Sequence, residues 1–181
     1  VMTKQQNNNS EIPGMNLPTN YSPKNPAMPE DAEKVQKQVE KKKKELEKFK
    51  NFIIKKFKFI QAIGILPPQS LPKVIEEEIG ENVPKEEMDK LLKKQHLYII
   101  VPEDKFKEIP KIKTEIIKEL EKEKLDVWAH VKTPIDVWET CLDSKFDVSD
   151  AIAMAYPLYD KGFLGALRVA VIHKSLVLQK F

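Results

Sequence analysis

The sequence contains a single cysteine, Cys141, among 181 residues. One thiol excludes an internal disulfide and a zinc site built from several cysteines. Cys141 lies within an apolar helical run, which favours a packed thiol over a nucleophile. A chain without disulfides suits a reducing compartment, so we expect a cytoplasmic protein.

Long apolar runs are also missing. No stretch approaches the roughly 20 consecutive apolar residues that a membrane-spanning helix needs, and the polar N-terminus is unlike a secretory signal. No internal repeat of solenoid length occurs. We therefore expect no membrane association.

The sequence has no large excess of one charge. The net charge is +3, so any affinity for nucleic acid would have to come from a local cluster of basic residues. Hydrophobic residues make up 41% of the chain, enough for a packed core beneath a heavily charged surface. The length suits one domain of ordinary size.

The N-terminal segment 1–30 differs in composition from the rest. It holds "KQQNNNS", five prolines and almost no large apolar residues, so it cannot bury enough surface to offset its ordering entropy. We expect a disordered tail or linker there, unless a partner orders it. The domain then covers 31–181.

A long charged helix is predicted over 31–57. Its apolar positions recur at intervals of three, four and seven residues, with an interruption at Lys42 and Lys43. The stripe consists of Val35, Val39, Leu46, Phe49, Ile53 and Phe57. We expect its first half to be solvated or partner-bound and its second half to enter the core.

Strands alternate with helices over the rest of the chain. Alternation and proline positions predict strands over 59–66, 95–101 and 126–133. Helical segments are predicted over 71–79, 84–94, 103–109, 111–124, 135–142 and 163–181, with a break at Pro110 and a short helix and a turn within 147–162. This order predicts an α/β (α+β) fold, a mixed sheet of at least three strands with flanking helices.

The stretch "QHLYIIVPED" (95–104) carries the most informative strand. Its pattern places His96, Tyr98 and Ile100 on one face and Leu97, Ile99 and Val101 on the other. A buried strand that ends in proline and acids often delivers a side chain to an active site. Here an imidazole and a phenol would point inward, with no carboxylate beside them on the strand.

The element order resembles the nucleotidyltransferase fold of the DNA polymerase β type. The likeness covers about 43–181 and is most specific from Val127 onward, in "VWAHVKTPIDVWETCLDSKFDVSDAIAMAYPLYDKGFLGALRVAVIHKSLVLQKF". That stretch is similar to the region just upstream of the catalytic domain in uncharacterised, archaeal-type nucleotidyltransferase proteins. The resemblance therefore implies a fold and an adjoining catalytic domain more than a function.

The active motif of that family is a glycine-serine turn after the first strand, followed by a strand with two aspartates one residue apart. Residues two apart on a strand share a face, so both carboxylates can hold a pair of divalent ions. In this chain Gly64 is present but Ile65 replaces the serine, and His96 and Tyr98 stand where the acid pair would fall. The resemblance thus implies a pseudoenzyme, an accessory or regulatory domain with no catalytic residue, metal or cofactor.

The closing helix is the candidate docking element. It is apolar nearly all round, which a helix with one solvent-exposed face should not be. Its apolar residues are Leu164, Leu167, Val169, Val171, Ile172, Leu176 and Leu178. We expect it to bind an adjoining catalytic domain or another protein, and a homo-oligomer fits the same pattern.

Two alternatives remain open. The first is an active, magnesium-dependent nucleotidyltransferase with displaced carboxylates, taken from Glu103 and Asp104 or from Asp136 and Asp143. The second is a nucleic-acid-binding module that uses the lysine-rich helix. Its contacts would be Lys41, Lys42, Lys43 and Lys44, although a run of lysines is more often a solvated face.

Other polar residues have ordinary structural interpretations. Asp147 and Asp150 precede or open a short helix, which predicts an N-cap at Asp147 rather than a magnesium site. His96 and His130 could meet on neighbouring strands, but scattered histidines are more often structural. "YPLYDKG" (156–162) predicts an exposed turn with Gly162 as its left-handed residue.

Overall fold

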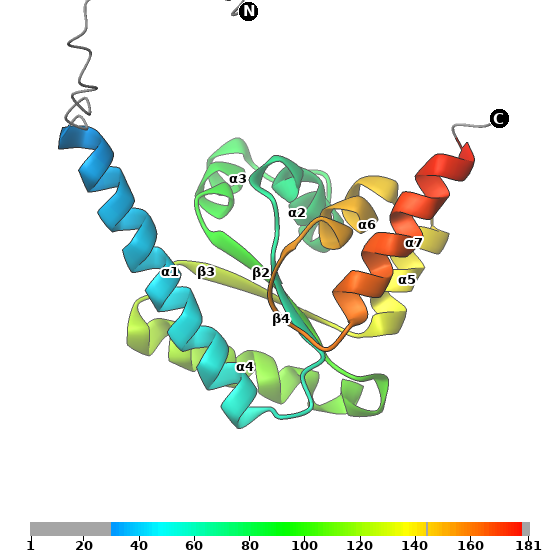
Figure 1. The fold of residues 1–181 in the computed structure, drawn as a ribbon, viewed down its shortest axis with the longest axis horizontal. Helices are drawn as coiled ribbons and strands as arrows, with labels where there is room; N and C mark the ends of the chain where they lie inside the picture. Colours follow the sequence, from blue (N-terminus) through cyan, green and yellow to red (C-terminus); the bar gives the residue numbers. More distant parts are fainter. Residues whose placement is uncertain (1–29, 144, 179–181) are drawn as a thin grey trace, which may run out of the picture. The chain divides into compact units, whose positions relative to one another are not determined.

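The computed structural model describes residues 30–143 and 145–178 (Figure 1), so the predicted tail lies outside the described residues except for Glu30. The chain divides into two units, Val1–Lys37 and Gln38–Phe181, and the sheet belongs to the second. The elements in chain order are α1 (Glu30–Lys56), β1 (Ala62–Ile65), η1 (Pro68–Ser70), α2 (Leu71–Ile79), α3 (Lys85–Leu92), β2 (Gln95–Ile100), η2 (Glu103–Glu108), α4 (Ile109–Glu123), β3 (Val127–Lys132), α5 (Pro134–Leu142), α6 (Phe146–Ala153), β4 (Tyr156–Asp160) and α7 (Phe163–Leu178).

The strands form one mixed sheet in the order β3-β2-β1-β4. Strand β1 is antiparallel to both β2 and β4, whereas β2 and β3 are parallel. The predicted α/β fold, mixed sheet and long leading helix are confirmed. The expectation of a turn over 156–162 is wrong in part, because β4 occupies 156–160; Pro157 weakens the strand signal there, and an edge strand tolerates it.

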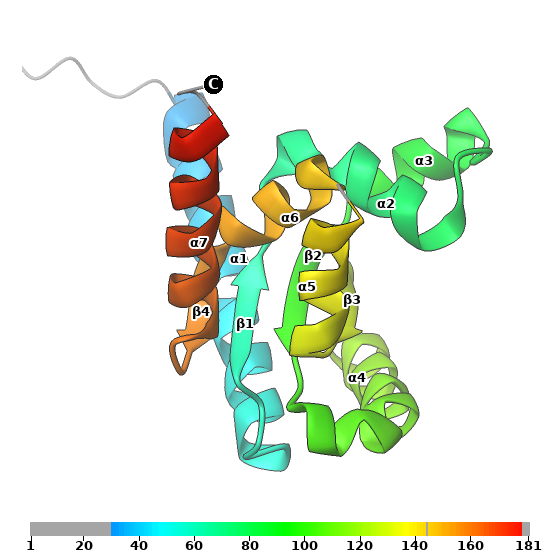
Figure 2. The same ribbon diagram turned by 90° about the vertical axis from the view of Figure 1, so that its right-hand side faces the viewer.

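Each face of the sheet has its own helices (Figure 2). Helix α4 and the last turns of α1 cover one face, and α2, α5, α6 and α7 cover the other. The predicted alternation along β2 is confirmed, since Leu97, Ile99 and Val101 pack on the first face and Tyr98 and Ile100 on the second. Strand β2 therefore contributes side chains to both cores. Burying one such side chain stabilises the fold by about 1.5–3 kcal/mol.

Helix ends show where local sequence rules hold. The predicted division near Pro110 is confirmed: η2 ends at Glu108 and α4 begins at Ile109, with Pro110 in its first turn, where its missing N–H has no partner to lose. Asp147 is not the N-cap of α6, which begins one residue earlier with Lys145 as cap, although the acid still lies in the first turn. Helix α5 begins with a capping box, in which Thr133 and Asp136 each accept a hydrogen bond from the other's backbone N–H.

Candidate functional site

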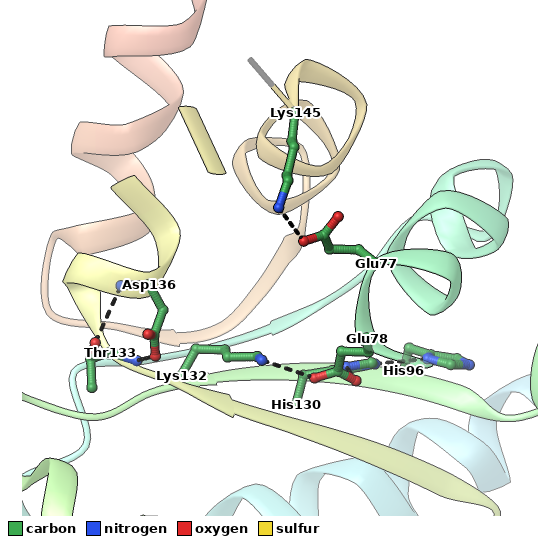
Figure 3. A network of polar contacts seen from close by, with 8 residues as sticks. All are labelled: Glu77, Glu78, His96, His130, Lys132, Thr133, Asp136 and Lys145. Carbon is green, nitrogen blue, oxygen red and sulfur yellow. Dashed lines mark hydrogen bonds and ion pairs between the residues drawn. The ribbon is translucent and has the colours of Figure 1, made fainter. Parts of the chain in front are cut away.

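A cleft of about 790 Å³ follows the outer strand β3. Helix α2 and helix α5 form its wall on one face of the sheet, and α4 forms its wall on the other. Its polar side chains come from α2, β3, α5 and neighbouring segments, and Figure 3 shows the polar contacts of several of them from close by. This cleft holds the densest set of interacting polar groups in the described part of the chain.

A chain of three hydrogen bonds lies at the wall of the cleft. The Glu78 Oε2 atom is 2.6 Å from His130 Nδ1, and His130 Nε2 is 2.8 Å from His96 Nδ1. The last link joins His96 Nε2 to the Leu91 carbonyl at 2.8 Å. The chain therefore ties α2 and the end of α3 to the two parallel strands β2 and β3 (Figure 3).

The geometry fixes how many protons this chain holds. Three hydrogen bonds need three protons, and the Leu91 carbonyl can only accept, so His96 Nε2 carries one of them. The other two protons lie in the Glu78–His130 and His130–His96 contacts.

The surroundings keep Glu78 ionised. Burial alone would raise its pKa, but the hydrogen bond and charge of His130, together with Lys132, outweigh burial and lower the pKa to about 2. The Lys132 Nζ atom lies 3.2 Å from Glu78 Oε1. Burial lowers the pKa of His96, the Leu91 carbonyl opposes that shift, and His130 reinforces it.

Aromatic rings enclose the His130 ring. Its centroid lies 5.1 Å from that of Trp128 and 5.9 Å from that of Tyr98, in stacked arrangements. These rings help to bury His130, which is 1% exposed. Burial, aided by the charge of Glu78, raises the pKa of Tyr98, which stays a neutral phenol at the wall of the cleft.

His96 and Tyr98 both lie against His130, on one face of β2 as the strand pattern predicted; Tyr98 lines the cleft and His96 is fully buried. Gly64 and Ile65 lie within β1, not in the turn where the resemblance placed them, and Gly64 pairs with Tyr98. A Cβ atom at Gly64 would lie 2.9 Å from Ala155 Cβ and 3.2 Å from Leu164 Cδ1. Close packing therefore accounts for the glycine.

Three of the four carboxylates of the magnesium alternative make other contacts. Glu103 accepts a hydrogen bond from the Ile135 N–H, Asp136 belongs to the α5 capping box, and Asp143 lies 3.7 Å from Lys145. Lys145 also pairs with Glu77 at 2.5 Å (Figure 3). Among the described residues, no group of three or more histidines, cysteines or acids is arranged to hold a metal ion.

The remaining predicted residues lie elsewhere. The lysines 41–44 are exposed on α1, outside the cleft. Leu164 and Leu167 are buried in the core, so they cannot form a free docking surface, and Val171 packs against the same core. The side chains of Leu176 and Leu178 lie outside the described residues. On α7 the exposed large apolar side chains are instead Val169 and Ile172.

Sequence reasoning missed Glu78, the residue that supplies the carboxylate. A signal was present, because Leu71, Val74 and Ile75 define the buried stripe of α2 at helical spacing and Glu78 continues it. An acid on an apolar stripe needs a buried partner. His130, on a neighbouring element, is that partner.

Searches of protein-family models, curated proteins and solved structures found no match to this chain. Within the described residues, no helix has both the length and the apolar character that crossing a bilayer requires.

Proposed function

We propose that this chain is a non-catalytic accessory domain, nucleotidyltransferase-like in architecture, that docks on a protein partner through the outer surface of α7. The α7 surface is defined here by Met154, Tyr156, Val169 and Ile172. The exposure of these four side chains is the observation that carries the proposal.

Exposed apolar residues are concentrated near the end of the described chain. Eight of the twelve exposed large apolar side chains fall between 134 and 173. Val169 is 68% exposed and Tyr156 is 66% exposed, values that leave most of each side chain in water. Clustered exposure of this kind is typical of a protein-binding surface.

A rigid connection holds the α7 surface together. Arg168 donates hydrogen bonds to the carbonyls of Ala153 and Ala155, at 2.9 and 3.0 Å. These carbonyls flank Met154 and precede Tyr156, so the arginine fixes both residues beside the α7 helix. Asp160 accepts hydrogen bonds from three N–H groups at the start of α7, which anchors that end. A preorganised surface loses little entropy on binding.

The state of the cleft supports a non-catalytic role. Two of its titratable side chains, Glu78 and His130, belong to the hydrogen-bonded chain with His96, and a third, Asp136, is held by a helix cap. Groups committed to internal hydrogen bonds are poorly placed to exchange protons with a substrate.

The test uses the double variant Val169→Glu/Ile172→Glu, with Val39→Glu on α1 as the matched control because Val39 is 60% exposed. We expect the wild-type chain and the control to bind a hydrophobic fluorescent dye and to retain the same partner from native cell extract. The double variant should lose both. Equal dye binding and an identical set of captured proteins for all three chains would overturn the proposal.

The charge of α1 favours a second candidate function, the binding of a nucleic-acid backbone. Residues 38–58 contain nine lysines and three glutamates, although the whole chain has a net charge of only +3. Lys161 donates a hydrogen bond to the Lys58 carbonyl, which adds a cation to the end of this helix. A phosphate backbone would bind there without sequence preference.

This candidate predicts a steep loss of affinity for a fluorescent oligonucleotide as salt rises. Replacing Lys41, Lys42, Lys43 and Lys44 with glutamine should abolish the binding. Replacing Lys118 and Lys122 on α4 with glutamine is the control, because both already pair with glutamates. Unchanged binding by the first variant would eliminate α1 as the contact.

A further inference from the structure

The two edges of the sheet are protected to different degrees. The outer strand β4 contains Pro157, and its pairing with β1 shifts register between Ile63 and Gly64. Proline and register shifts are devices that stop further strands from adding to an edge. Strand β3 has neither: its six residues pair in unbroken register with β2, from Gln95↔Val127 to Ile100↔Lys132.

The free side of β3 presents unpaired backbone groups. The carbonyls of Asp126 and Lys132 accept hydrogen bonds from the β2 side, at 2.9 and 2.8 Å. In a parallel ladder, alternate residues face the neighbouring strand with both their N–H and their C=O. The N–H and C=O groups of Val127, Ala129 and Val131 therefore point away from β2, and no described strand pairs with them.

The cleft continues around this free edge. Its lining includes all six residues of β3, with Ile116, Ile117 and Leu120 of α4 on one side and Glu78 of α2 on the other. Ile117 is 53% exposed and Ile79, at the end of α2, is 46% exposed. An added strand would therefore find both backbone partners and apolar side chains at this edge.

The charges at the two ends of β3 are complementary to each other. Asp126 precedes the strand with a side chain that is 72% exposed, and Lys132 ends it. If a second β3 runs antiparallel with Ala129 opposite Ala129, then Val127 faces Val131 and Asp126 faces Lys132. This register uses all three outward-facing residues and places opposite charges across from each other, which stabilises a strand pair.

We propose that two copies of this chain associate through β3, antiparallel and with the two-fold axis at Ala129, to form a continuous eight-stranded sheet. The occupant of the edge is thus a second copy of the chain. Each copy supplies the same surface, as in an isologous dimer. This interface is separate from the α7 surface and does not depend on the accessory role.

The first test measures mass by light scattering and analytical ultracentrifugation over a range of concentrations. We expect a dimer for the wild type and a monomer for Ala129→Pro, because proline removes an outward N–H while the β2 pairing stays intact. Ala129→Ser keeps the N–H and should remain dimeric. Circular dichroism and thermal unfolding show whether Ala129→Pro is folded.

A charge exchange keeps the proposal testable if the proline variant does not fold. Asp126→Lys and Lys132→Glu should each weaken self-association, since like charges then meet across the axis. Mixing the two variants should restore a dimer that contains one copy of each, because both contacts regain opposite charges. A monomeric wild type, or a dimer that survives every β3 variant and is lost in Val169→Glu/Ile172→Glu, would overturn the proposal.

Discussion

The two faces of the sheet are built on different principles. On the face covered by α1 and α4, the core is formed by aliphatic and phenylalanine side chains, including Ile53, Ile99 and Ile116. On the opposite face, the same strand β2 contributes His96 to a hydrogen-bonded chain with His130 and Glu78, and Tyr98 stacks on the His130 ring. Side-chain shape and buried apolar area decide the stability of the first face. The number of bound protons and the hydrogen-bond geometry decide part of the stability of the second face.

This difference has a consequence for specificity. An apolar core tolerates repacking as long as volume is kept. A buried polar chain tolerates only the arrangement that satisfies every donor and acceptor. The chain of hydrogen bonds on the second face joins α2 and α3 to β2 and β3. It therefore fixes where the helical segment 71–94 lies on the sheet.

The largest effect is expected on the apolar face. Ile99→Ala removes a fully buried side chain and leaves a cavity, which should cost about 3–4 kcal/mol of unfolding free energy. Denaturation in urea measures this loss. The exposed Ile117→Ala is the matched control and should change stability by less than about 0.5 kcal/mol. A small loss for Ile99→Ala would mean that the face can collapse around the cavity.

On the polar face, we expect a somewhat smaller effect from Glu78→Ala, about 2–3 kcal/mol, because the buried His130 Nδ1 atom would lose its hydrogen-bond partner. Glu77→Ala is the control, since its pair with Lys145 is partly exposed and worth no more than about 1 kcal/mol. The double variant Glu78→Leu/His130→Leu should lose less than the sum of its single variants. Additive losses would show that the two residues do not act as a unit.

A third prediction concerns the close packing of β1 on the polar face. Gly64→Ala places a methyl group 2.9 Å from Ala155 Cβ, and overpacking of this kind should cost about 1–2 kcal/mol. Gly165→Ala on α7 is the control, because its nearest contact is an ordinary 3.7 Å and alanine favours a helix. An unchanged thermal midpoint for Gly64→Ala would remove the packing explanation for this glycine.

The apolar face could be predicted from the sequence, and the polar face only in part. Alternation along 95–101 and the stripe of Phe49, Ile53 and Phe57 depend on local periodicity, which the sequence carries directly. Pro157 weakened the strand signal of β4 in the sequence. The pairing of β4 with β1 spans a long separation in the chain, which local patterns do not encode.

The hydrogen-bonded chain of Glu78, His130 and His96 was also only partly predictable from the sequence. The possibility that His96 and His130 meet was visible from two adjacent strands, but the role of Glu78 required the relative position of α2 and β3, 52 residues apart. Leu164 and Leu167 were expected on an exposed docking face but are buried, because α7 is apolar on all sides and only packing decides which side is buried.

The smallest expected effect is a dependence of the unfolding free energy on pH, which distinguishes the two faces. The pKa of His96 is lowered by burial, so below pH 6.5 the unfolded chain binds a proton that the folded chain does not, and stability falls on acidification. One such group gives a slope of at most about 1.4 kcal/mol per pH unit. Glu78, with its pKa lowered to about 2, adds a second fall between pH 4.5 and 2.

Urea denaturation between pH 6.5 and 4.5 isolates the His96 contribution, because Glu78 stays ionised in the folded and unfolded chains over most of that range. His96→Gln should flatten the slope. Ile99→Ala should lower stability by a constant amount at every pH, because the apolar face contributes no titrating group at that position. A slope that changes in Ile99→Ala but persists in His96→Gln would contradict the division of the sheet into an apolar face and a proton-dependent face.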